Sequence, residues 1–188
     1  MSVIKNQVHS LYTQVKSTEI KTEHVVVAIV QETPLVFSRI TGLFRRRGFH
    51  LKSLTIGACE QSGYSRMTIV IDGTKTDTEQ VIKQLYKVIE VIKVSDISFD
   101  QTVQRELALV KIYATKASRS EIMQIVDIFR GNIVDVGHDS LMVEITGDSS
   151  KVDSFLDLIR GFGIKELART GLTAMNRGAS GQVNGCKI

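Results

Sequence analysis

One order of secondary-structure elements, strand–helix–strand–strand–helix–strand, occurs twice in this chain of 188 residues. In the first copy, runs of Val, Ile and Thr predict strands, and apolar residues spaced three and four apart predict helices. The six segments of this copy are residues 24–31, 34–47, 50–58, 64–72, 76–89 and 91–98. A repeated order of this kind restricts the chain to an architecture of two similar units.

The second copy follows directly along the chain. Its predicted segments are residues 107–115, 118–131, 132–136, 141–146, 150–159 and 164–172. Asp72-Gly73 and Thr146-Gly147 stand at the same place in the two copies, just before the second helix. We therefore expect an α+β fold of two ferredoxin-like βαββαβ units, each an antiparallel sheet with two helices on one face.

Local signals mark where the helices begin and end. Thr33-Pro34 predicts an N-cap followed by a proline, and Gly48 predicts the end of that helix after three arginines. Three further starts are predicted by capping boxes, Thr76–Glu79, Ser118–Glu121 and Ser150–Asp153. The first helix points its N-terminus back at the preceding turn, which makes this turn a candidate pocket for the carboxylate of a small ligand.

The strand predicted at residues 24–31 is apolar on both faces. Because helices cover only one face of a ferredoxin-like sheet, the other face of this strand needs a partner. Either the two units pack together, or the chain forms a homodimer by joining sheets edge to edge. We favour the homodimer through the first units.

Composition describes an ordinary globular protein, with 43% hydrophobic and 23% charged residues. The net charge of +4 permits an acidic partner but does not require nucleic acid. Cys59 and Cys186 form neither a metal-ligand pair nor a disulfide framework, so a reducing, cytoplasmic setting is expected. The apolar runs are too short to cross a membrane, and we expect no membrane partner.

No catalytic or metal-binding pattern is present in the sequence. The four histidines lie in unrelated elements, without Cys or carboxylates at ligand spacing. Glu32 and His50 could meet at the mouth of the first helix, where a surface pair is the simpler interpretation. An RNA-recognition module stacks bases on aromatic residues of its central strands, but only Tyr64, at an edge, is aromatic here. We therefore expect no nucleic-acid partner, and no cofactor or metal in this chain.

Sequence blocks in both copies resemble one known family. They are SRITGLF at 38–44, RGF at 47–49, SLT at 53–55, SRMTI at 65–69, KQL at 83–85, RELALVKI at 105–112, IFRGNIVDV at 128–136 and ARTG at 168–171. On these blocks, residues 23–178 resemble the small, regulatory subunit of acetohydroxyacid (acetolactate) synthase. The first unit resembles an ACT domain, the amino-acid-sensing βαββαβ module.

The resemblance implies a non-catalytic chain. Its partner would be the catalytic subunit, which carries thiamine diphosphate, FAD and Mg²⁺; the small subunit activates it and makes it sensitive to branched-chain amino acids, typically valine. The effector would lie in the first turn, at the interface of two ACT domains. The candidate effector-binding residues are Glu32, Leu35, Val36, Phe37 and His50.

Three candidate positions depart from the family, which usually has Asn, Gly and Asn where Glu32, Leu35 and His50 stand. A leucine side chain occupies space that glycine leaves for the ligand. Ionised Glu32 can only accept hydrogen bonds, whereas Asn can also donate. We therefore predict an activating subunit with altered or weak valine sensing.

The predicted domains are an N-terminal extension at 1–22, the ACT domain at 23–100, a second ferredoxin-like domain at 101–178 and a flexible tail at 179–188. Two other functions stay open at this point. One is a stand-alone ACT-type amino-acid-binding module, and the other is an RNA-binding ferredoxin-like protein. Co-purification with a catalytic subunit would separate both from the regulatory function.

Overall fold

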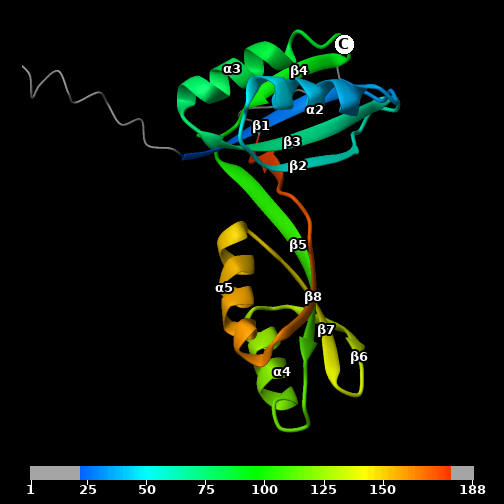
Figure 1. Ribbon diagram of the computed structural model, residues 1–188, viewed down its shortest axis with the longest axis vertical. Helices are drawn as coiled ribbons and strands as arrows, with labels where there is room; N and C mark the ends of the chain where they lie inside the picture. The colour runs from blue at the N-terminus through cyan, green and yellow to red at the C-terminus, as the bar shows by residue number, and fades with distance from the viewer. Residues whose placement is uncertain (1–21, 179–188) are drawn as a thin grey trace, which may run out of the picture.

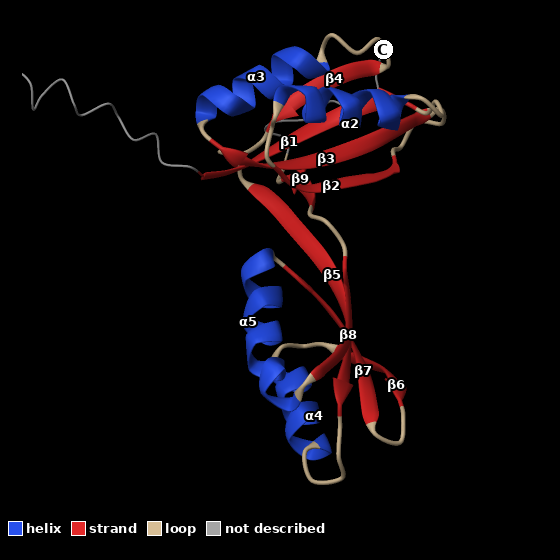
Figure 2. Cartoon of the chain, in the orientation of Figure 1, coloured by secondary structure: helices blue, strands red, loops and turns tan. Residues whose placement is uncertain are grey.

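A computed structural model describes residues 22–178 of the chain (Figure 1). It contains two antiparallel sheets, each with two helices on one face, and the long strand β5 leads from the first sheet to the second (Figures 1 and 2). The predicted α+β fold of two ferredoxin-like units is confirmed. The predicted tail lies outside the described residues, as does the predicted N-terminal extension apart from Thr22.

The first unit contains four strands and two helices. They are β1 (Thr22–Gln31), α2 (Val36–Arg47), β2 (Leu51–Ala58), β3 (Tyr64–Gly73), α3 (Lys75–Leu85) and β4 (Val91–Asp96). The strands lie in the order β2-β3-β1-β4. β1 pairs with β3 from Thr22 opposite Gly73 to Gln31 opposite Tyr64. This pairing makes β1 a central strand and leaves β2 and β4 at the sheet edges.

The second unit has the same layout. Its elements are β5 (Thr102–Tyr113), α4 (Arg119–Ile128), β6 (Asn132–Val136), β7 (Ser140–Gly147), α5 (Ser149–Ile159), the 3₁₀ turn η1 (Arg160–Phe162) and β8 (Ile164–Arg169). The strands lie in the order β6-β7-β5-β8. Phe155 is fully buried between α5 and the sheet, and its ring meets Phe129 edge to face at 5.5 Å. Each unit therefore has its own apolar core.

The last predicted strand, 164–172, is in fact two strands. β8 ends at Arg169, and a separate strand β9 (Thr173–Asn176) pairs with the first residues of β5. We name residues 170–176 the strap, because they cross from the second unit to the open face of the first sheet (Figure 1). There the apolar side chains of the strap complete a cluster made by Val25, Val27, Val70, Ile97, Leu172 and Ala174.

The strap removes one argument for a homodimer. Val25 and Val27 are buried on the face of β1 that the helices do not cover. Because the strap of the same chain contributes to their burial, the apolar second face of β1 does not require another copy. Our reason for favouring a homodimer was therefore wrong. Joining of sheets edge to edge stays a prediction, since β2 and β4 are the edges of the first sheet.

The start of α3 differs in register from the prediction. Thr74 and Asp77 form the capping box: Asp77 N donates to Thr74 Oγ1 at 3.2 Å, and Thr74 N donates to Asp77 Oδ2 at 2.8 Å. The box predicted at Thr76 is therefore wrong by two residues. The helix also ends early, at Leu85, and Ile89, the last residue of the predicted helix, is 85% exposed.

The caps of the second unit differ in a similar way. Asp148, not Ser150, is the N-cap of α5, and its carboxylate accepts from Lys151 N at 2.8 Å. This backbone hydrogen bond lowers the pKa of Asp148. Ser118 is at the N-cap position of α4, but its side chain bonds Thr115 and caps no helix amide. A Ser or Thr with an acidic residue three positions later thus predicts that a helix starts nearby. It does not reliably predict which residue is the N-cap.

We expect Thr74→Ala to lower the free energy of unfolding by about 1 kcal/mol, because it leaves a first-turn amide of α3 without its acceptor. Gln80→Ala, on the exposed side of the same helix, is the matched control and should change it by less than about 0.5 kcal/mol. Urea unfolding followed by circular dichroism measures both. Equal midpoints for the two variants would contradict the observed register of the cap.

Candidate functional site

The turn between β1 and α2 is tied to two other parts of the first unit. Gln31 N donates to Glu90 O at 2.8 Å, and Glu32 N donates to Gly63 O at 2.9 Å. The first bond joins the turn to the segment before β4, and the second joins it to the turn before β3. The turn therefore has a defined place at one end of the sheet.

The N-terminus of α2 lacks a side-chain cap. The helix begins at Val36 with Leu35 at the N-cap position, and its first turn has no acidic residue. The predicted cap, Thr33, is therefore wrong; its Oγ1 is buried without a hydrogen-bond partner among the described residues. Uncapped amides at a helix N-terminus attract an anionic group. This end of α2 suits a carboxylate better than a cation.

The predicted site residues around this turn differ in exposure. Glu32 is exposed, and Leu35 and Phe37 are 58% and 51% exposed. Val36 lies between them along the chain, but its side chain packs in the core of the first unit. Val36 can therefore offer a ligand only its backbone, whereas Leu35 and Phe37 present large apolar side chains at the helix N-terminus.

His50 lies at the other end of the sheet. Asp72 N donates to His50 O at 3.1 Å, near the end of β3, whereas Glu32 is bonded to Gly63 just before β3 begins. At ~3.3 Å per residue, the length of β3 separates the two sites by roughly 30 Å. The expected meeting of Glu32 and His50 is therefore wrong within one chain.

A groove of about 540 Å³ lies beside the turn, between α2 and the segment that joins α3 to β4. Leu35 and Ile89 contribute apolar surface at its rim. Its cationic lining residues are Arg39, Arg46, Arg47 and Lys87. The single carboxylate of the lining is Glu90, so the groove carries a net positive charge.

Arg39 and Glu90 form an ion pair in this groove. Glu90 is 8% exposed, and its second oxygen, Oε2, is buried without a partner among the described residues. The sequence analysis did not single out either residue. The available signal was a lone carboxylate inside the apolar run at residues 88–92. A carboxylate there must be either exposed or paired, and the structure shows that it is paired.

Among residues 22–178, no group of three or more His, Cys, Asp or Glu side chains is placed to hold a metal ion. No helix in that range is long and apolar enough to cross a membrane.

Comparison with known proteins identifies the family. An AHAS small subunit-like ACT domain matches residues 27–93, and the small subunit of acetolactate synthase matches residues 105–178. The probable acetolactate synthase small subunit of Methanothermobacter thermautotrophicus is 54% identical over 157 residues, which is 83% of this chain and 94% of the relative. The Bacillus subtilis acetolactate synthase small subunit is 44% identical over 158 residues, 83% of this chain and 91% of the relative. The chain belongs to the acetolactate synthase small-subunit family.

A solved structure agrees with this assignment. The crystal structure of the acetolactate synthase small subunit from Thermotoga maritima is 41% identical, with a TM-score of 0.78, and the match covers 84% of this chain and 98% of that one. The resemblance seen in the sequence blocks is thereby confirmed. The RNA-binding alternative loses its support, because the strap of this small subunit lies on the sheet face that RNA-recognition modules use for stacking.

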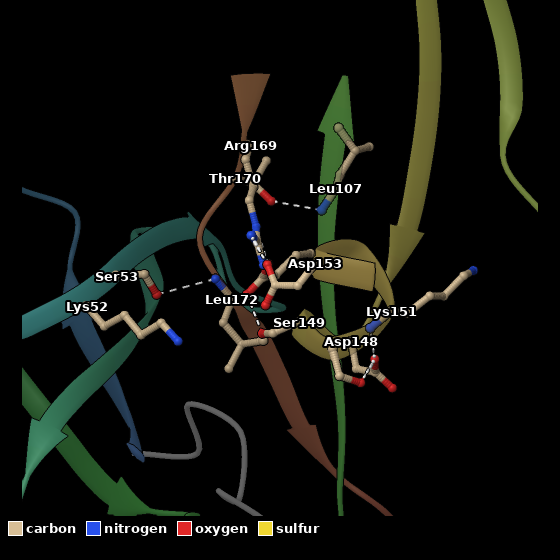
Figure 3. A network of polar contacts seen from close by, with 12 residues as sticks. Lys52, Ser53, Leu107, Asp148, Ser149, Lys151, Asp153, Arg169, Thr170 and Leu172 are labelled. Atoms are coloured by element: carbon tan, nitrogen blue, oxygen red, sulfur yellow. Dashed lines mark hydrogen bonds and ion pairs between the residues drawn. The ribbon is translucent and has the colours of Figure 1, made fainter. Parts of the chain in front are cut away.

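A second polar cluster of the small subunit lies where the chain leaves the second unit for the ACT domain (Figure 3). Arg169 donates from Nε to Glu106 Oε2 and from Nη1 to Asp153 Oδ1, both at 2.6 Å. Ser149 Oγ donates to Glu106 Oε1 at 2.6 Å. Burial lowers the pKa of Arg169, but hydrogen bonds to Asp153 and Glu106 outweigh it and raise that pKa. The cluster joins β5, α5 and β8 just before the strap begins.

We expect Arg39→Ala to lower the free energy of unfolding by about 2 kcal/mol, because it leaves the buried Glu90 carboxylate without a cation. Arg45→Ala removes a charge from the same helix at an exposed position and should cost less than about 0.5 kcal/mol. Urea unfolding of both variants at neutral pH is the measurement.

A double variant provides the control for the Arg39 and Glu90 pair. Adding Glu90→Gln to Arg39→Ala removes the unpaired charge, so the double variant should be more stable than Arg39→Ala alone. If the stability losses of Arg39→Ala and of Glu90→Gln simply add up in the double variant, the two side chains do not stabilise the fold through their interaction.

Proposed function

We propose that this small subunit binds the catalytic subunit of acetolactate synthase in the cytoplasm and raises its activity, without catalysis of its own. The observation that carries the proposal is that both units match the family over nearly the full length of small-subunit relatives. Thiamine diphosphate, FAD and Mg²⁺ then belong to the catalytic subunit. This chain contributes a binding surface and a regulatory ACT domain.

Purified alone, the chain should form no acetolactate from pyruvate. Added to the catalytic subunit of its own cell, it should raise the rate of acetolactate formation severalfold, and the two should co-purify. Heat-denatured chain at the same concentration is the control. An unchanged rate at saturating chain would contradict the regulatory function, and failure to co-purify would favour a stand-alone module.

The proposed effector site is shared between two copies of the ACT domain. β2 is an edge strand, and its last residue, Ala58, lies opposite Ser65 at the same end of the sheet as Glu32. Antiparallel pairing of β2 with its copy puts the start of one strand beside the end of the other. His50 of the second copy would then lie at the end of the sheet that carries Glu32. One site can thus use residues that lie far apart within each chain.

Valine is proposed to bind this site weakly, because of Leu35 first and Glu32 second. A ligand carboxylate at the amides of α2 must pass the Leu35 side chain at the N-cap position. Glu32 disfavours binding if the ligand carboxylate faces it, and favours binding if the ammonium group does. The steric hindrance by Leu35 does not depend on the orientation of the ligand, because the side chain fills the same space whether the carboxylate or the ammonium group faces Glu32.

Leu35→Gly should therefore tighten valine binding at least about tenfold, which corresponds to about 1.4 kcal/mol. Calorimetry of the unmodified chain and the variant with valine, leucine and isoleucine measures the change, on samples whose mass by light scattering is that of a dimer. Leu158→Ala removes a leucine side chain of similar exposure, 54%, from α5 of the second unit and should leave the affinity within about twofold. Tight valine binding by the unmodified chain would contradict steric closure.

A further inference from the structure

The strap is attached to the ACT sheet by few apolar side chains. Leu172 and Ala174 are 4% and 1% exposed and lie on the open face of the sheet. They pack with Val25, Val27 and Val70 of the central strands. Met175, the next residue of the strap, points away from this cluster and is 62% exposed. The apolar part of the attachment therefore depends mainly on one large side chain, Leu172.

Two hydrogen bonds and one close fit complete the attachment. Arg66 Nη2 donates to Ala174 O at 3.0 Å, and Leu172 N donates to Ser53 Oγ at 3.4 Å. A Cβ atom added at Gly171 would overlap Thr55 Oγ1 and would lie 3.2 Å from Ser53 Cβ. The chain can pass this close to β2 only because residue 171 has no side chain.

Some polar groups beneath the strap lose water without full compensation. Thr55 Oγ1 and Arg66 Nε are buried without a hydrogen-bond partner among the described residues. Burial also lowers the pKa of Arg66, as expected for a guanidinium that has lost solvent. Unpaired buried donors and acceptors offset part of the free energy gained by burying Leu172. The attachment to the ACT sheet is therefore a weak one.

The strap keeps its own strand pairing if it leaves the ACT sheet. β9 pairs with Thr102–Arg105 of β5, and Arg177 N donates to Gln101 O at 2.7 Å. The contacts with the ACT sheet are made by side chains, by the backbone N–H of Leu172 and by the backbone carbonyl of Ala174. Detachment would thus break no strand ladder and would uncover Val25, Val27 and Val70.

We propose that the strap attaches reversibly to the ACT sheet and that its attachment sets the position of the second unit relative to the ACT domain. The chain crosses between the units twice, once from β4 into β5 and once through the strap. A single crossing leaves the backbone dihedrals of its linking residues free to turn, whereas two crossings define an orientation. Release of the strap leaves one crossing, so the second unit moves and the open face of the ACT sheet becomes accessible. The proposal concerns the small subunit alone and does not depend on its activating role.

Spin labels on the two units measure their relative position in the full chain. One label is placed through Gln80→Cys on α3 and the other through Glu121→Cys on α4, both exposed, in a background with Cys59→Ser and Cys186→Ser. The parent should give one narrow distance distribution. Leu172→Asp places a charge in the apolar cluster and should broaden it. Met175→Asp adds the same charge to the exposed side of the strap and should leave it narrow.

A suppressor pair tests the same contact without a buried charge. Gly171→Ala should broaden the distance distribution and speed hydrogen exchange of the Leu172 amide, which donates to Ser53 Oγ of the ACT sheet, at least about tenfold. Thr55→Ala removes the oxygen that the new methyl group overlaps, so the double variant should restore the narrow distribution and slow exchange. Thr55→Ala alone should behave as the parent.

Three results would overturn the proposal. The first is a narrow, unchanged distribution in both Leu172→Asp and Gly171→Ala, which would mean that the β4–β5 crossing sets the orientation alone. The second is a broad distribution in the parent. The third is failure of Thr55→Ala to restore Gly171→Ala. If Leu172→Asp unfolds the ACT domain, as circular dichroism would report, the suppressor pair decides between these outcomes.

Discussion

Burial of both faces of β1 is the constraint on which the rest of this structure depends. A central strand with Val or Ile on both sides must exclude water twice, and each such side chain contributes about 1.5–3 kcal/mol when buried. Helices α2 and α3 cover one face, with Val26, Ala28 and Val30 in the core beneath them. The strap packs against the other face, over Val25 and Val27. Burial of the second face of β1 therefore contributes to the contact between the two units.

The same strand leads to the candidate effector site. β1 ends at Gln31, and the following turn carries Glu32 and the uncapped N-terminus of α2. The turn is held from two sides, by Gly63 and by the backbone of Glu90, whose carboxylate pairs with Arg39. The turn therefore directly follows a strand whose other face packs against the strap.

Much of the local structure could be predicted from sequence patterns, and the errors have a common origin. Each predicted helix and strand has a counterpart, because apolar periodicity reports burial directly, but the last predicted strand ends early and a separate strand follows it. Thr33, Thr76 and Ser150 are not the N-caps of their helices, and Ser118 stands at the N-cap position of α4 without capping a helix amide. Which residue becomes the cap depends on where the preceding strand ends, as Thr74 after Gly73 and Asp148 after Gly147 show.

The sequence by itself determined the doubled βαββαβ order and the family resemblance, since these depend on residue type and spacing along the chain. Only the tertiary structure decided that His50 and Glu32 lie at opposite ends of one sheet, that Glu90 is the buried partner of Arg39, and that residues 170–176 cover the open face of the ACT domain. These three facts are contacts between segments far apart in sequence. No local pattern encodes them, because each depends on how two folded units and their edges meet in space.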